Sequence, residues 1–80
     1  MGTADRILAK MRQNPRDWRI EDLLTVAASE GLNIRRPGGS HVVFTFPDLD
    51  AQVAVPAHRP IRPVYIRLFL DLVDKVRARQ

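Results

Sequence analysis

Arginines, glycines and a histidine lie together in the middle of the chain, in the run Arg35-Arg36-Pro37-Gly38-Gly39-Ser40-His41. Imidazole is the side chain that exchanges protons near neutral pH, and guanidinium is a permanent cation whose shape matches a phosphate. A proton-transfer group beside fixed positive charge suits chemistry on a phosphodiester. His41 is therefore the first candidate for a catalytic residue.

RNA is the phosphodiester that needs the fewest protein groups for its cleavage, because the ribose 2′-hydroxyl supplies the nucleophile. The imidazole of His41 can accept the proton of that hydroxyl, or as imidazolium protonate the leaving 5′-oxygen. The backbone at Gly38-Gly39 lets a phosphate approach closely, and Ser40 adds a hydroxyl and an amide donor. The alternative interpretation is an ordinary hairpin turn followed by a half-exposed strand histidine, and one histidine does not decide between the two.

The second candidate is His58, which lies next to Arg59 just after an expected third strand. Antiparallel pairing of the second and third strands places the start of one opposite the end of the other, so both imidazoles can meet as an acid–base pair. The alternatives are a loop histidine that binds phosphate or one without a role. Two histidines with few nearby carboxylates are a poor metal-ligand set, so we expect no metal and no cofactor.

The charge of the chain is concentrated around these histidines. The 80 residues carry a net charge of +4; positions 31–67 hold five arginines against two aspartates, while positions 1–30 balance. A local positive field attracts polyanions, although arginines that only solubilise the surface give the same composition. A helix start at Pro63 would favour an anion at Arg62. The predicted phosphate contacts are Arg35, Arg36, Arg59 and Arg62, with Arg67 as a further candidate.

Two aromatic residues, Trp18 and Tyr65, could stack on bases, although a lone tryptophan near a helix start more often packs in the core. The spacing of apolar residues predicts the elements that position all these groups. Helices are expected from Thr3, as the cap, to Asn14-Pro15, from Ile20 to Glu30 with Gly31 closing the end, and from Pro63 onward. Strands are expected over 32–36, 41–46 and 51–55.

The short connections between these strands require antiparallel pairing. Alternation places Val42, Phe44 and Phe46 on one face, and His41, Val43 and Thr45 on the other. The predicted fold class is α+β, in the order α-α-β-β-β-α, with a three-stranded antiparallel sheet covered by helices on one face. The His41 face is expected to stay partly open.

The length predicts a single domain over 1–80, in which residues 1–19 add a leading helix and turn to a core over 20–76. No apolar run approaches the roughly 20 residues of a membrane span, and no signal-peptide pattern opens the chain. We therefore expect a soluble cytoplasmic protein without membrane contact.

Three segments together resemble the HicA family of toxin ribonucleases, which are mRNA interferases. These are Gly39-Ser40-His41 followed by Phe44, then Val53 to His58, then Pro63 to Leu70. The resemblance runs from about Ile20 to Val76, and the combination is far more specific than any one element. Residues 1–19 resemble a longer subgroup with an additional leading helix.

The resemblance implies a double-stranded-RNA-binding-domain-like fold, metal-independent cleavage of mRNA, and neutralisation by a co-encoded HicB antitoxin. The family's catalytic histidine falls on His41, Gly39 and Ser40 match its flanking residues, and His58 matches the histidine after the third strand. Val42 stands where many members have a second histidine, which weakens a mechanism with two adjacent imidazoles. Arginine replaces the lysines usual in the basic loop, which keeps the charge.

The sequence thus predicts a toxin endoribonuclease that cuts mRNA by histidine-dependent acid–base catalysis, with RNA and a HicB-type antitoxin as partners. Two alternatives stay open. One is a non-catalytic RNA-binding module of the same fold, whose binding would depend strongly on salt. The other is a protein-interaction subunit whose exposed face serves only a partner.

Overall fold

The computed structural model describes residues 2–47, 49–58 and 60–79, and the elements follow one another in the predicted order. They are α1 (Thr3–Gln13), α2 (Ile20–Glu30), β1 (Asn33–Arg35), β2 (His41–Thr45), β3 (Gln52–Pro56) and α3 (Pro63–Ala78). The strands form one antiparallel sheet in the order β1-β2-β3. The α+β class and the order α-α-β-β-β-α are therefore confirmed.

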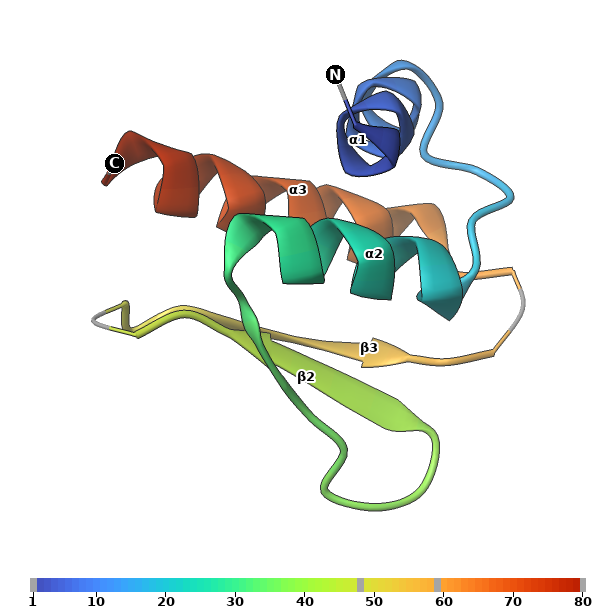
Figure 1. Cartoon of the computed structure of the whole chain (residues 1–80). Helices are drawn as coiled ribbons and strands as arrows, with labels where there is room; N and C mark the ends of the chain where they lie inside the picture. Colours follow the sequence, from blue (N-terminus) through green and yellow to red (C-terminus); the bar gives the residue numbers. More distant parts are fainter. Residues whose placement is uncertain (1, 48, 59, 80) are drawn as a thin grey trace.

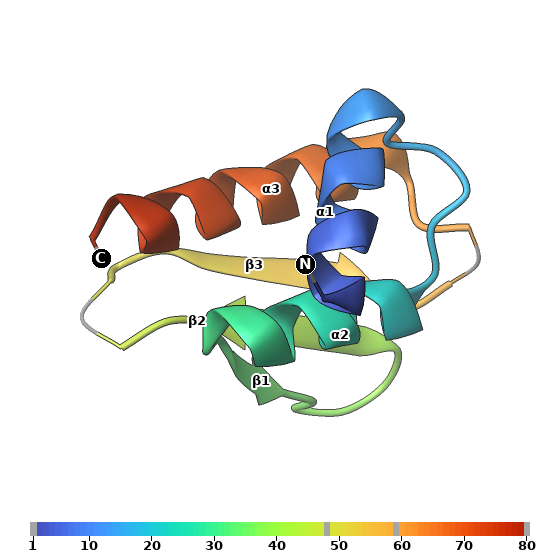
Figure 2. The ribbon, with the colours of Figure 1, turned by 45° about the horizontal axis from the view of Figure 1, so that its top comes forward.

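The elements stack in three layers (Figure 1). Helices α2 and α3 lie side by side on one face of the sheet, and α1 crosses above them, on the side away from the sheet (Figure 2). None of the described helices covers the opposite sheet face. One face of β2 therefore packs against the core, and no described helix covers its other face.

The helix ends follow from local chemistry. Thr3 is the first helical residue rather than the cap, because Gly2 takes the cap position and its backbone N–H donates to the Asp5 carboxylate at 3.4 Å. At the end of α2, Gly31 adopts a left-handed φ of 77°. The N–H of Leu32 then donates to the Ala27 carbonyl at 2.9 Å, which closes the helix and folds Leu32 onto the core.

The hydrophobic core lies between the sheet and the helices. At its centre the rings of Phe44 in β2 and Phe69 in α3 meet edge to face, with centroids 5.0 Å apart. Both side chains are completely buried, and so is Met11 of α1. The leading helix therefore contributes to the same core as the sheet.

Ion pairs join the helices at the surface. Arg12 of α1 pairs with Asp74 of α3 at 2.6 Å. Arg77 of α3 pairs with Glu30 of α2 at 2.8 Å and reaches Asp5 of α1 at 3.7 Å. The hydrogen bond to Glu30 raises the pKa of Arg77, because it stabilises the charged guanidinium.

The open sheet face is less exposed at its centre than the alternation predicts. Val43 lies there on the middle strand, between Arg35 of β1 and Ala54 of β3, and only 7% of it is exposed. His41 shares this face but has no β1 residue beside it, and it is exposed.

Candidate functional site

The position of His41 is set by the shortness of β1. That strand pairs with Val43, Phe44 and Thr45 only, so β2 extends two residues beyond it. His41 and Val42 therefore pair with β3 alone. The His41 side chain is exposed on the open face, where a large ligand can approach it both from that face and from the side on which β1 has ended.

The second imidazole comes to the same end of the sheet. His41 lies directly opposite Pro56, and the N–H of Ala57 donates to the Ser40 carbonyl at 2.7 Å, which continues the β2–β3 pairing by one more rung. His58 follows immediately and is exposed. Diagonal neighbours in such a ladder have side chains within reach of one another. The register thus supports the predicted approach of His41 and His58.

The loop before His41 depends on its glycines. Gly38 and Gly39 have φ values of 147° and 64°, which side chains with a Cβ rarely adopt. A Cβ added at either glycine would meet no atom within 4 Å, so the glycines serve the backbone turn rather than close packing. Ser40 is exposed between this turn and His41. The loop therefore presents an open approach to the imidazole.

The predicted phosphate contacts lie on both sides of His41. Arg35 shares the open face and sits diagonally from His41, since its strand partner is Val43. Arg36 begins the loop that leads to His41, and Arg62 immediately precedes α3. All three arginines are exposed. Arg59 lies outside the described residues, and Arg67 lies within α3, where it is exposed.

These arginines differ from those that fasten the helices together. Arg12 and Arg77 have carboxylate partners, whereas Arg35, Arg36 and Arg62 form no ion pair with any described residue. Their charge is therefore not neutralised within that part of the chain. Unpaired cations around an exposed imidazole favour an anionic ligand.

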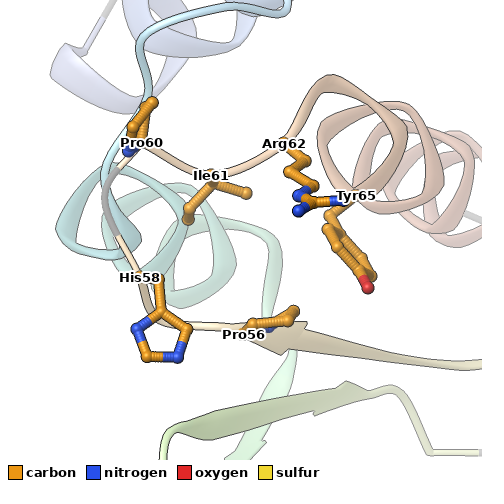
Figure 3. A pocket seen from close by; sticks show the side chains of 6 residues that line it. All are labelled: Pro56, His58, Pro60, Ile61, Arg62 and Tyr65. Carbon is orange, nitrogen blue, oxygen red and sulfur yellow. The ribbon is translucent and has the colours of Figure 1, made fainter.

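A hollow of about 650 Å³ opens where β3 gives way to α3 (Figure 3). We call it the β3–α3 hollow. Arg62 and Tyr65 lie next to one another at the start of α3, and face Pro56 and His58 across it. Its lining consists of Pro56, His58, Pro60, Ile61, Arg62 and Tyr65.

A contact with the leading segment, which the residue types do not predict, fixes this hollow. The N–H of Ile61 donates to the carbonyl of Trp18 at 2.9 Å, in an isolated antiparallel bridge. The indole N–H of Trp18 donates to the Asn14 carbonyl at 2.7 Å, and its ring packs partly buried against the core. Trp18 therefore holds the loop before α3 in place. No pattern of neighbouring residues in the sequence predicts a backbone bridge between segments so far apart.

No group of three or more potential metal-ligating side chains forms among the described residues. Within the same part of the chain, no helix combines the length and apolarity needed to cross a membrane. No protein-family model matches the chain, and comparisons with curated proteins and with solved structures find nothing similar.

Proposed function

We propose that this protein is an endoribonuclease that cuts mRNA, a toxin of the HicA type that acts in the cytoplasm. The observation that carries the proposal is the exposed His41, with unpaired arginines around it and His58 two residues beyond Pro56, the cross-strand partner of His41. The antiparallel sheet with helices on one face is compatible with the double-stranded-RNA-binding-domain-like fold, which forms part of the proposal.

In the proposed reaction one imidazole accepts the proton of a ribose 2′-hydroxyl while that oxygen attacks the adjacent phosphorus. The bond from phosphorus to the 5′-oxygen breaks, and an imidazolium donates a proton to the departing oxygen. The products are a 2′,3′-cyclic phosphate and a 5′-hydroxyl. His41 takes one of these two roles, and the register makes His58 the candidate for the other.

The arginines stabilise the additional negative charge on phosphorus as the bond to the 2′-oxygen forms. Arg35 and Arg36 approach from the β1 side, and Arg62 from the start of α3. Arg59, although outside the described residues, stays a proposed phosphate contact through its place next to His58. Gly39 and Ser40 support His41 by shaping the open turn before it.

The valine after His41 fits a mechanism without adjacent imidazoles. Val42 points to the helix-covered face and only 1% of it is exposed. A side chain there faces away from His41 and from any RNA on the open face. A second proton-transfer group must therefore come from another strand or loop, as His58 does.

The proposed protein partner is a HicB-type antitoxin that covers the open sheet face. Its contact surface should be acidic, because the face carries Arg35 and adjoins Arg36 and Arg62 without pairing carboxylates among the described residues. Covering His41 would block RNA without changing the fold of the toxin.

The test incubates a defined mRNA transcript with the purified full chain and a metal chelator. The variants are His41→Ala and, as a control, Gln52→Ala, an exposed residue at the other end of β3. We expect wild type and Gln52→Ala to cut, and His41→Ala to bind RNA nearly as well but to cut at least roughly 100-fold more slowly.

Other outcomes of this assay identify the competing functions. Salt-dependent binding without new RNA ends would indicate the non-catalytic binding module. No RNA binding even at low salt would indicate the protein-interaction subunit. Equal cutting by His41→Ala and wild type would remove His41 from the mechanism.

A further inference from the structure

The β3–α3 hollow has the size and the walls of a ligand site. Its volume of about 650 Å³ lies within the range of sites that hold small molecules or single nucleotides. Pro56, Pro60 and Ile61 give it apolar surface, and Ile61, only 2% exposed, closes it toward the core. Among the described residues, the polar groups that line it are an imidazole, a guanidinium and a phenol, without a carboxylate. This lining disfavours a cation and suits a ligand with a flat ring and a phosphate.

Several backbone N–H groups of the lining are absent or already used. Its prolines have no N–H. The N–H of Ile61 is used by the Trp18 carbonyl, and that of Tyr65 donates to the Arg62 carbonyl at 3.0 Å. The side chains available to a ligand are the ring of Tyr65, the guanidinium of Arg62 and the imidazole of His58. Stacking on an aromatic ring and contact with a phosphate are the means by which proteins hold single-stranded RNA.

We propose that the β3–α3 hollow holds one unpaired nucleotide of the RNA, with its base stacked on Tyr65 and a phosphate at Arg62. This inference rests on the proposed function, since it places that nucleotide beside the bond that His41 cuts. Pro56 lines the hollow and is the cross-strand partner of His41, so the two sites adjoin. A base reaches Tyr65 only after leaving its own helical stack. The substrate is thus single-stranded RNA or an unpaired stretch within a folded one.

Binding is measured in the His41→Ala background, so that the RNA stays intact. The probes are a short labelled single-stranded RNA, the same strand annealed to its complement, and a series of strands lacking one base at successive positions. We expect the intact single strand to bind more tightly than the duplex. Removal of one particular base should weaken binding roughly 5- to 150-fold, the effect of one stacked base.

Variants of the hollow should reproduce this loss. Tyr65→Ala should weaken binding of the intact strand by a similar factor, whereas Tyr65→Phe, which keeps the ring, should bind like the parent. Arg62→Gln should weaken binding and reduce its dependence on salt. Val64→Ala and Arg79→Gln are the matched controls, because both residues are exposed and neither lines the hollow.

Equal affinity for the single strand and the duplex, or no sensitivity to any missing base, would overturn the inference. Tyr65 is partly buried against the core, so the base-deletion series keeps the test decisive even where Tyr65→Ala does not fold. Failure of the two proposals can be told apart. If cutting depends on His41 but binding is insensitive to the removal of any base, only the proposed nucleotide site is contradicted. If the wild-type chain cuts no RNA but its binding is sensitive to the removal of one base, the nuclease proposal is contradicted and the nucleotide-binding site stands.

Discussion

Pro56 lies directly opposite His41 in the β2–β3 ladder and also forms part of the lining of the β3–α3 hollow. One residue thus belongs both to the strand that positions the imidazole and to the surface that leads toward α3. Bonded and non-bonded pairs alternate in an antiparallel ladder, so the hydrogen bond next to this pair is made by Ala57, whose N–H donates to the Ser40 carbonyl just before His58. This pairing therefore brings the proposed acid–base pair next to the proposed nucleotide site.

Replacing His58 tests whether the two imidazoles act together. We expect His58→Ala to slow RNA cutting by about 100-fold or more and to change the shape of its pH profile, since one of two proton-transfer groups is lost. His58 is exposed, so the thermal unfolding of the variant should match that of wild type. A reduced rate with an unchanged pH profile would instead assign His58 to phosphate binding.

Placing a histidine after His41 tests the orientation of the central strand. Val42→His should destabilise the protein by about 2 kcal/mol or more without faster cutting, because it places a polar ring in the core. Ala54→His is the matched control, since Ala54 lies on the open face of β3 and is exposed, so the imidazole can reach water. Chemical denaturation compares the two. An equally stable Val42→His with increased cutting would contradict the placement of Val42.

The unpaired arginines should make RNA binding depend on salt. In the His41→Ala background, Arg35→Gln should weaken binding similarly for different RNA sequences and lower the salt slope by about 1, because one phosphate contact is lost. Arg79→Gln, at the far end of α3, should leave the slope unchanged. Titrations over a range of salt concentrations measure this slope. Equal slopes for both variants would remove Arg35 from the RNA contacts.

Much of the fold follows from local signals in the sequence. The end of α2 at Glu30 is predicted correctly, because Gly31 specifies it through a left-handed φ. Strand bounds differ by at most one residue at each end, since strand ends depend on partners. Within α2, Leu24 is only partly buried, while Val26 is fully buried. That difference arises from how α2 sits against its neighbours, which a helical period alone does not determine.

The candidate site is predictable only where it is local. The turn at Gly38 and Gly39 and the strand start at His41 can be read from adjacent residues. The approach of His58 can be anticipated from antiparallel pairing. The β3–α3 hollow cannot, because its shape depends on the bridge between Trp18 and Ile61, which joins two loops by backbone atoms alone. Side-chain types carry no information about such a bond.

The leading helix should contribute to the stability of the whole chain. Met11→Ala should lower the free energy of unfolding by about 2–5 kcal/mol, because Met11 is completely buried within the common core. Lys10→Ala, an exposed neighbour on the same helix, should change it by less than about 0.5 kcal/mol. Denaturant unfolding measures both. Similar small changes for the two variants would mean that α1 folds apart from the core.

The pair of Arg77 and Glu30 should stabilise the protein independently of pH around neutrality. The Arg77 side chain is 44% exposed, but that of Glu30 is only 10% exposed, so removing the guanidinium leaves a largely enclosed carboxylate without this partner. We expect Arg77→Gln to cost about 1 kcal/mol. Arg12→Gln, which breaks the more exposed pair with Asp74, should cost less.

The pH dependence follows from the raised pKa of Arg77. A group whose pKa is raised by folding stabilises the protein fully below its unfolded pKa and loses that effect only as the pH rises through the folded value. For an arginine this window lies at about pH 12 and above. The difference in unfolding free energy between wild type and Arg77→Gln, measured by denaturant at about pH 6 and about pH 9, should therefore be the same. A difference that shrinks toward pH 9 would show that another titrating group, rather than the guanidinium, governs this contact.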